Sequence, residues 1–314
     1  MLRTPCDGVH RLYGHGANAW GANTLPFVPL TRGHVLNTRC RRKMDNRVQQ
    51  YLNGVAQLRP NSANSLVSVI LFGSAATGSF SQSSDVDLII VVPGETSTQE
   101  RCILRAAVVD LEIRHGFRPP QSRSMNPLEV FAEHAAGHAH AAFICTRDDL
   151  ISGDVARIFG LRGAEQIFVE RMLLASVIVS ARTVWGEDLL SLVPLPCLRR
   201  LDVFKSLFRS TAFILFCAAA FPVLSDATKY ATITLKHSLH SCYFCYGMKT
   251  VSLDDEVAFF NARLAGDRTL KDLLNQRREH HRSFTFVLRC VRILFRLHLR
   301  TLRDNRFPRS VARA

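Results

Sequence analysis

The order of apolar and polar residues divides the chain into an α/β half and a helical half. Residues 66–72 and 86–92 are short, nearly continuous apolar runs, which are typical of buried strands. A segment rich in glycine and serine separates them. Residues 96–115 have the periodicity of a helix, and a third strand is expected at residues 140–145. Strands and helices in this order indicate a small mixed sheet with helices packed on it.

Helical periodicity dominates the rest of the sequence. Val48, Tyr51, Leu52 and Val55 recur at helical spacing directly after Met44. After residue 160 no strand pattern is found, and only helices are expected. Their expected ranges are 164–181, 201–221, 227–246, 253–264 and 269–303. The predicted fold class is therefore α/β (α+β), with a small mixed-sheet domain followed by an all-helical C-terminal domain.

Two folded domains and two unusual ends are expected. The α/β domain is placed at residues 44–160, the helical bundle at residues 161–303, and a basic tail at residues 304–314. Residues 1–43 have no helical or strand periodicity, so we expect a leader with little order. This leader is explained either by translation of upstream sequence before a natural start at Met44 or by an Arg-rich targeting peptide.

Charge is distributed unevenly along the 314 residues, which carry a formal net charge of +14. Residues 1–43 have a net charge of +6 and residues 277–314 a net charge of +9, so the rest of the chain has a net charge of −1. The basic composition therefore does not indicate a nucleic-acid-binding face over the whole molecule.

The sequence gives no sign of a membrane-spanning or secreted protein. An apolar, uncharged stretch of the helical half, residues 210–225, contains Pro222 and is shorter than the about 20 residues that a bilayer requires. The first residues lack the apolar segment of a secretory signal. The nine cysteines are odd in number, and most have apolar neighbours, as buried free thiols do. We therefore expect a cytoplasmic protein without a transmembrane segment.

Residues that could bind a metal ion or a phosphate lie at the facing ends of the first two apolar runs. Gly73 and Ser74 follow the first run, while Asp85 and Asp87 are two residues apart, so both carboxylates leave the same face of a strand. Two carboxylates among apolar residues repel each other and need a counter-charge, which Mg²⁺ commonly supplies together with substrate phosphates. A glycine also lets a phosphate approach the backbone, where N–H groups at a helix start can bind it. The two parts together predict a site for a metal ion and a triphosphate.

Residues 69–92 resemble the nucleotidyltransferase superfamily, which includes DNA polymerase beta, the aminoglycoside nucleotidyltransferases and the small bacterial antitoxin-type enzymes. The family pattern is an apolar strand, Gly-Ser or Gly-Gly, a short polar stretch, and then Asp-x-Asp in a second apolar strand. The matching residues in this chain are Gly73, Ser74, Ser84, Asp85 and Asp87. The resemblance is specific over this segment and fades outside it.

The resemblance implies an activity and its cofactor. Asp85 and Asp87 would be catalytic and would hold two Mg²⁺ ions, which bridge the triphosphate of an NTP and align an attacking hydroxyl. Gly73, Ser74 and Ser84 would bind the nucleotide. A nucleoside monophosphate would be transferred and pyrophosphate would leave. The hydroxyl acceptor is unidentified: a small antibiotic, a protein side chain and an RNA end all remain open.

One part of the family pattern is missing from the sequence. The family usually carries a third carboxylate on the next strand, yet residues 140–145 contain no acid. Asp110 and Glu112 in the preceding helix, or Asp148 and Asp149 after the strand, are the acids that could replace it. The alternative function is therefore a catalytically degenerate member that binds nucleotide, RNA or protein without turnover.

A row of arginines marks the expected C-terminal helix. They recur every three or four residues, and they are Arg289, Arg292, Arg296, Arg300 and Arg303. Such a stripe can bind nucleic-acid phosphates or anionic lipid, and it is also typical of a solvated helix face. Lys236 could in the same way reach a phosphate from the helical half, although an exposed lysine is the more common meaning of such a residue.

Overall fold

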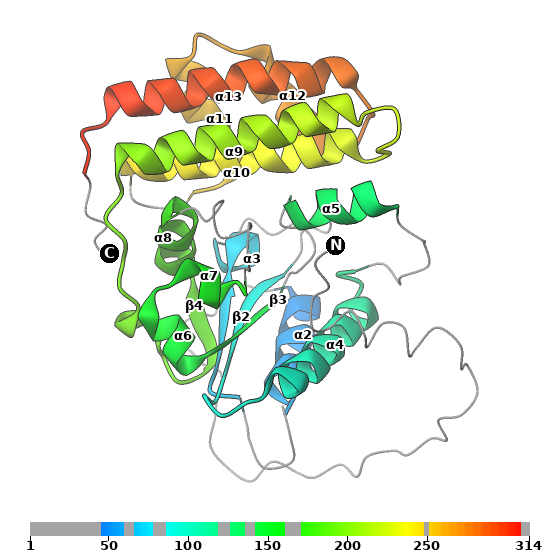
Figure 1. Ribbon diagram of the computed structural model, residues 1–314, viewed down its shortest axis with the longest axis vertical. Helices are drawn as coiled ribbons and strands as arrows, with labels where there is room; N and C mark the ends of the chain where they lie inside the picture. The colour runs from blue at the N-terminus through cyan, green and yellow to red at the C-terminus, as the bar shows by residue number, and fades with distance from the viewer. Residues whose placement is uncertain are drawn as a thin grey trace.

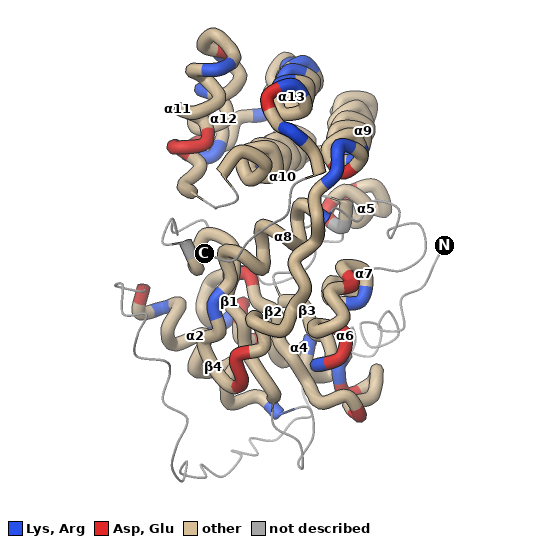
Figure 2. Tube along the Cα trace, turned by 90° about the vertical axis from the view of Figure 1, so that its left-hand side faces the viewer, with Lys and Arg blue, Asp and Glu red and all other residues tan. Residues whose placement is uncertain are grey.

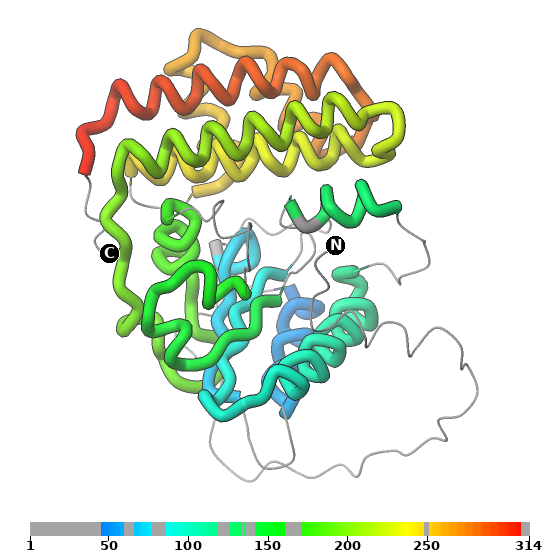
Figure 3. The backbone as a smooth tube through the Cα atoms, in the orientation of Figure 1, coloured from blue at the N-terminus to red at the C-terminus, as the bar shows by residue number. Residues whose placement is uncertain are grey.

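A computed structural model provides the fold of this protein. The residues that it describes are 45–59, 66–77, 86–118, 126–135, 142–160, 171–247 and 251–308. A domain built on a β-sheet lies below a domain of long helices (Figure 1). Figure 3 follows the backbone from the blue N-terminal elements of the sheet domain to the red C-terminal helix. The expected leader, residues 1–43, lies outside the described residues, and the expected domain boundaries remain predictions.

The sheet has four strands in the order β3-β2-β1-β4. β1 (Ser68–Phe72) runs antiparallel to both β2 (Asp87–Val92) and β4 (Arg182–Gly186), whereas β3 (Ala142–Thr146) runs parallel to β2. Every residue of β1 is buried, which explains its continuous apolar sequence. The mixed sheet and the strands predicted from the first two apolar runs are confirmed.

Helices cover both faces of the sheet. On one face, α2 (Asn46–Ala56) and α4 (Thr98–Arg114) pack their apolar residues against alternate residues of the central strands. On the other face lie α6 (Arg147–Ser152), α7 (Val155–Ile158) and α8 (Arg171–Ser180). Ser97 and Glu100 form a capping box that fixes the start of α4. The result is a three-layer domain whose two cores lie on either side of the strands.

The fourth strand corrects the expectation that residues after 160 form only helices. β4 is an edge strand, and only Val184 among its five residues is buried. Its sequence therefore has no apolar run by which a strand could be recognised. Gly186 ends β4 with φ +80°, and a Cβ there would lie 2.2 Å from the carbonyl oxygen of Val67. The strand is followed by a short 3₁₀ helix, η3 (Leu190–Leu192).

The helical domain is built around α10. The helices of this domain are α9 (Arg200–Ala219), α10 (Ala227–Gly247), α11 (Leu253–Arg263), α12 (Arg268–Arg278) and α13 (Phe284–Asp304). α10 contacts all four others and also α8 of the sheet domain. Its buried residues form the centre of the largest apolar core, together with residues of the surrounding helices. The predicted all-helical domain is confirmed.

One helix expected from the sequence is two helices in the structure. Residues 269–303 are divided between α12 and α13, which are separated by residues 279–283. These five residues, Glu-His-His-Arg-Ser, contain nothing apolar that a continuous helix could bury against the core. Ser283 instead caps α13 by accepting a hydrogen bond from the backbone N–H of Phe286.

Two short helices lie between the sheet and the helical domain. α3 (Gly73–Thr77) stands at the upper end of β1, and α5 (Pro127–Ala135) lies below α9 (Figure 1). α5 touches the end of α9 through the rings of Phe131 and Phe216, whose centroids are 5.1 Å apart. None of the helices in the described residues is both long and apolar enough to cross a bilayer.

Candidate active site

The strand register brings the two halves of the sequence motif together. β1 ends at Phe72 and β2 begins at Asp87, and the antiparallel register pairs these two residues directly. Gly73 and Ser74, the first residues of α3, therefore lie beside the start of β2. This end of the sheet faces the helical domain (Figure 1). The expectation that Gly73, Ser74 and Asp87 lie close together agrees with this arrangement.

Gly73 and Asp87 approach so closely that a side chain at position 73 would displace the carboxylate of Asp87. Gly73 has φ +68°, in the left-handed region that favours glycine. A Cβ at this position would lie 2.3 Å from Oδ2 of Asp87, far inside the contact distance of any real pair of atoms. The carboxylate of Asp87 therefore occupies the space that a side chain at position 73 would fill. This contact explains why the motif has a glycine, and not a residue with a side chain, at position 73.

The structure describes Asp87, the second aspartate of the motif, whereas Asp85, the first, lies outside the described residues. Asp87 is half-buried at the first position of β2, directly after the buried Val86. Ser84 and Asp85, which the sequence predicted as nucleotide and metal ligands, lie outside the described residues. Their contribution to the site remains a prediction.

The residues present fit a hard divalent cation. Mg²⁺ prefers carboxylate oxygens and keeps positions open for phosphates and water. Asp87 offers such oxygens, since its carboxylate is half-buried beside the backbone of Gly73. Within the described ranges, no group of three or more His, Cys, Asp or Glu residues could form a complete metal site. We expect Asp85 and the oxygens of the substrate to supply the further ligands of a site here.

The direction of β3 excludes two of the acids that could supply a third carboxylate. β3 is parallel to β2 and pairs Ala142 with Leu88 and Thr146 with Val92, so it begins at the same end of the sheet as Asp87. Asp148 and Asp149 follow the opposite end, about 16 Å away along the strands at about 3.3 Å per residue. The described residues of β3 carry no acid themselves.

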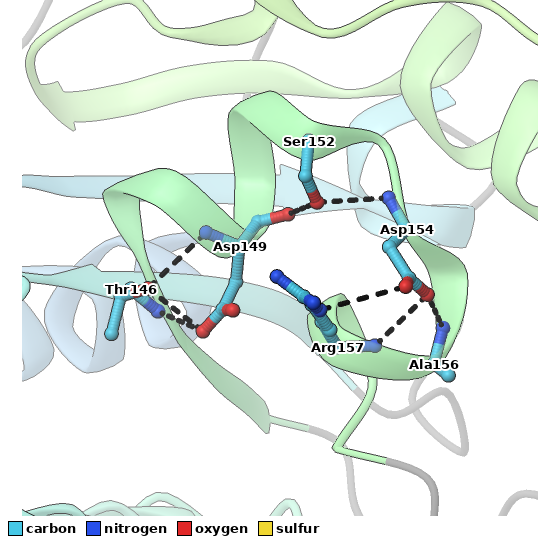
Figure 4. Close-up of polar contacts among 6 residues, drawn as sticks. All are labelled: Thr146, Asp149, Ser152, Asp154, Ala156 and Arg157. Carbon is cyan, nitrogen blue, oxygen red and sulfur yellow. Dashed lines mark hydrogen bonds and ion pairs between the residues drawn. The ribbon is translucent and has the colours of Figure 1, made fainter.

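Asp149 has a structural role at that far end. It forms a capping box with Thr146, whose hydroxyl donates a hydrogen bond of 2.7 Å to Oδ2 of Asp149 (Figure 4). The next helix is capped in a similar way, because Oδ1 of Asp154 accepts a hydrogen bond from the backbone N–H of Ala156. These acids satisfy the free N–H groups at the starts of α6 and α7.

Glu112 lies on the face of the sheet opposite to Asp87, because α4 packs with Leu88 and Ile90, whereas Asp87 shares the face of Ile89 and Val91. It is buried in the last turn of α4, where it forms an ion pair of 3.6 Å with Arg118. Burial raises the pKa of Tyr51 well above its usual value, and the negative charges of Glu112 and then Asp87 raise this pKa further. These charge effects act at a distance and do not bring the carboxylate of Glu112 to that of Asp87. Asp110, by contrast, is exposed on α4.

Arg182 is a residue of this region that the sequence did not single out. It begins β4, pairs with Leu71 of β1, and donates a hydrogen bond of 3.3 Å from Nη2 to the carbonyl oxygen of Ala75 in α3. Its Nε is buried, and no partner for this atom is found in the described part of the chain. Arg182 therefore holds α3, and with it Gly73 and Ser74, against the sheet. No sequence signal could have found it, because β4 itself was not recognised.

The arginine stripe of α13 is largely paired within its own domain. Arg289 lies 2.9 Å from Asp272, and Arg300 lies 2.7 Å from the carboxylate of Asp304. Arg292 and Arg296 both approach Asp267, the N-terminal cap of α12. Although burial raises the pKa of Asp267, hydrogen bonds from Thr269 and these two arginines hold it below its usual range. The ion pairs give the stripe a structural role, and nucleic-acid binding by it remains a prediction.

Comparison with known proteins gives a family for part of the chain. Residues 48–127 match the family model described as nucleotidyltransferase domain. A search of curated proteins finds no match. Among solved structures, the spectinomycin adenyltransferase AAD(9) from Enterococcus faecialis, in its crystal structure with ATP and spectinomycin, aligns with 12% identity and a TM-score of 0.45. The alignment covers 82% of this chain and 97% of that chain. We infer nothing from a similarity this weak. The relation to the nucleotidyltransferase family rests on the family match and on the sequence motif.

Proposed function

Because residues 48–127 form a domain of the nucleotidyltransferase superfamily, we propose that this protein transfers a nucleoside monophosphate from an NTP to a hydroxyl group of an acceptor. The observation that carries the proposal is the close approach of Asp87 to Gly73. It brings together the two halves of the motif, one suited to phosphate and the other to metal, at one end of the sheet.

Each residue of the site has a task in this reaction. Asp87, with Asp85, would hold Mg²⁺, two ions by resemblance to the family. Bound there, Mg²⁺ would neutralise charge on the triphosphate of the NTP. Gly73 lets the phosphates approach the backbone, and Ser74 and Ser84 offer hydroxyl groups to them. Arg182 keeps this segment in place through Ala75.

The transfer itself is a single displacement at phosphorus. The hydroxyl oxygen of the acceptor forms a bond to the α-phosphorus, the bond from that phosphorus to the bridging oxygen breaks, and pyrophosphate leaves. The hydroxyl proton must pass to a base. The carboxylates of Asp85 and Asp87 are the candidates for this role, since Asp148 and Asp149 follow the far end of the sheet and Glu112 lies on its other face.

We expect the helical domain to recognise the acceptor, because it stands over the end of the sheet where Asp87 lies (Figure 1). The three acceptor classes, a small antibiotic, a protein side chain and an RNA end, all carry a suitable hydroxyl. We expect the reaction to take place in the cytoplasm, where NTPs are available.

A second candidate function is binding without turnover. It is favoured by one observation, the lack of any acid in the described residues of β3, where the family usually has its third carboxylate. In this case the site at Gly73 and Asp87 would hold a nucleotide, and the protein would act through an RNA or protein partner.

One experiment separates these functions. The protein is incubated with each α-labelled NTP, Mg²⁺ or Mn²⁺, and a pool of small-molecule, protein and RNA acceptors. Asp87→Asn is the test variant, and Asp110→Asn, which removes an exposed acid on α4, is its matched control. Transfer that is lost only in Asp87→Asn supports the enzyme. Metal-dependent NTP binding without transfer supports the binding protein, and the absence of both refutes the proposal.

A further inference from the structure

Two long helices of the C-terminal domain lie side by side, α13 at the top of the domain and α9 at its flank (Figure 2). α9 and α13 are in contact along their length, as Figures 1 and 2 both show. The ring of Phe221, just after α9, is 5.2 Å from that of Phe284 at the start of α13, while Ser206 near the start of α9 contacts His298 near the end of α13. The two helices are therefore antiparallel.

Both helices expose large apolar side chains on the side that faces away from the core. The exposed fractions run from 43% for Phe295 to 72% for Phe208. These residues form what we call the outer apolar face: Leu201, Phe204, Phe208 and Leu215 of α9, with Leu288, Phe295 and Leu299 of α13. Their spacing of three, four or seven residues places them along one stripe of each helix. Monomeric proteins seldom expose so many large apolar residues together, and such patches mark sites of interaction.

The outer apolar face lies on helices with an excess of positive charge. α9 has three basic residues and one acid, and α13 has five basic residues and one acid. Of these two acids, Asp202 is buried and Asp304 accepts a hydrogen bond from Arg300. Lys205 and Arg303 are exposed, and the side chain of Arg292 is 76% exposed. Arg292 and Arg303 lie on the exposed stripe of α13 together with Leu288, Phe295 and Leu299, whereas Arg289 and Arg296 lie on its α12 side and pair with acids of α12 and its cap.

Two kinds of partner could cover the outer apolar face, a second copy of the chain or an anionic membrane, and its combination of apolar and basic groups favours the membrane. A second copy of the chain would bring two surfaces of the same sign together, and like charges oppose such an interface. An anionic bilayer suits both groups, because Phe and Leu enter the boundary between headgroups and acyl chains while Lys and Arg approach lipid phosphates. Each helix is about 30 Å long at about 1.5 Å per residue and would lie along the membrane surface. We propose that the outer apolar face binds the surface of an anionic membrane.

Vesicle flotation with the full chain tests this proposal. One set of vesicles contains phosphatidylcholine alone, and the other contains phosphatidylcholine with phosphatidylglycerol. The test variant is Phe208→Ser/Phe295→Ser, which changes two exposed side chains and should leave the fold intact by circular dichroism. Ile103→Ser is the matched control, since Ile103 is 56% exposed on α4 of the other domain.

The wild-type protein should float with the anionic vesicles and stay behind with phosphatidylcholine alone, and high salt should weaken the binding. The double variant should lose about tenfold or more in affinity, because two apolar side chains no longer enter the lipid, whereas Ile103→Ser should bind as the wild type does. Failure of the folded wild-type protein to bind, or equal binding by the double variant, would overturn the proposal. A dimer in sedimentation velocity that the double variant converts to a monomer would overturn it as well, because a second copy would then cover the face.

Discussion

Replacing Gly73 by alanine perturbs the candidate active site through one contact, between the new Cβ and the carboxylate of Asp87. The new Cβ would lie 2.3 Å from Oδ2 of Asp87, whereas ordinary contacts begin at 3.4 Å, so the carboxylate must move by about 1 Å. A displacement of about 1 Å in a catalytic group lowers the rate by roughly a hundredfold. The left-handed backbone at this residue adds about 1 to 2 kcal/mol of strain for any residue with a Cβ. We therefore expect Gly73→Ala to lose both stability and transfer activity.

The two effects can be separated with a matched variant elsewhere in the same domain. Gly160, after α7, has φ +67°, nearly the value of Gly73, and a Cβ there would meet nothing within 4 Å. Gly160→Ala should therefore suffer the backbone strain alone. Thermal unfolding should show similar losses of stability in the two variants, while label transfer and Mg²⁺-dependent NTP binding should fall only in Gly73→Ala.

Two results would refute this reasoning. Full activity in Gly73→Ala would mean that the position of the Asp87 carboxylate does not matter for the reaction. An equal loss of activity in Gly160→Ala would mean that strain in the domain, and not the contact with Asp87, is responsible.

Three further substitutions test other parts of the structure. Burial lowers the pKa of His298 from 6.5 to about 4, so the unfolded chain binds more protons than the folded one and stability falls as the pH drops from 6.5 towards 4. His298→Gln should remove this pH dependence, worth up to about 3 kcal/mol, from the free energy of unfolding in urea. Glu112→Gln should lower the stability of the sheet domain in thermal unfolding and leave label transfer unchanged, because Glu112 is buried with Arg118 on the face of the sheet opposite to Asp87, with Asp110→Asn as the unaffected control. Arg182→Gln should raise the KM for NTP, because α3 loses the donor that holds Ala75, and thermal unfolding should show that the domain remains folded.

The parts of the fold that the sequence predicted are those with strong local signals. β1 and β2 bury nearly all their residues, so their apolar runs are continuous, and the start of α4 is fixed by the neighbouring Ser97 and Glu100. β4 escaped prediction because an edge strand with one buried residue has no such run. The break between α12 and α13 was missed because apolar periodicity continues on both sides of five polar residues.

The candidate site was predictable to a similar extent. The spacing of Gly73 and Asp87 identified both residues, and their contact follows from an antiparallel pairing of two strands that are adjacent in sequence. Arg182 could not be found, because its place beside Leu71 depends on a pairing between segments more than a hundred residues apart. The link between Tyr51 and Glu112 depends in the same way on the packing of α2 against α4.

The direction of β3 decides which acids of the chain can lie beside Asp87. Had β3 run antiparallel to β2, the acids after its end would have come to lie beside Asp87 and would have completed a carboxylate triad. Because β3 is parallel to β2, Asp148 and Asp149 follow the other end of the sheet, where Asp149 caps α6. Asp110 and Glu112 belong to α4, which packs on the face of the sheet opposite to Asp87. None of the four acids that the sequence offered therefore lies beside Asp87 in the described residues, and we expect catalysis to rest on Asp85 and Asp87.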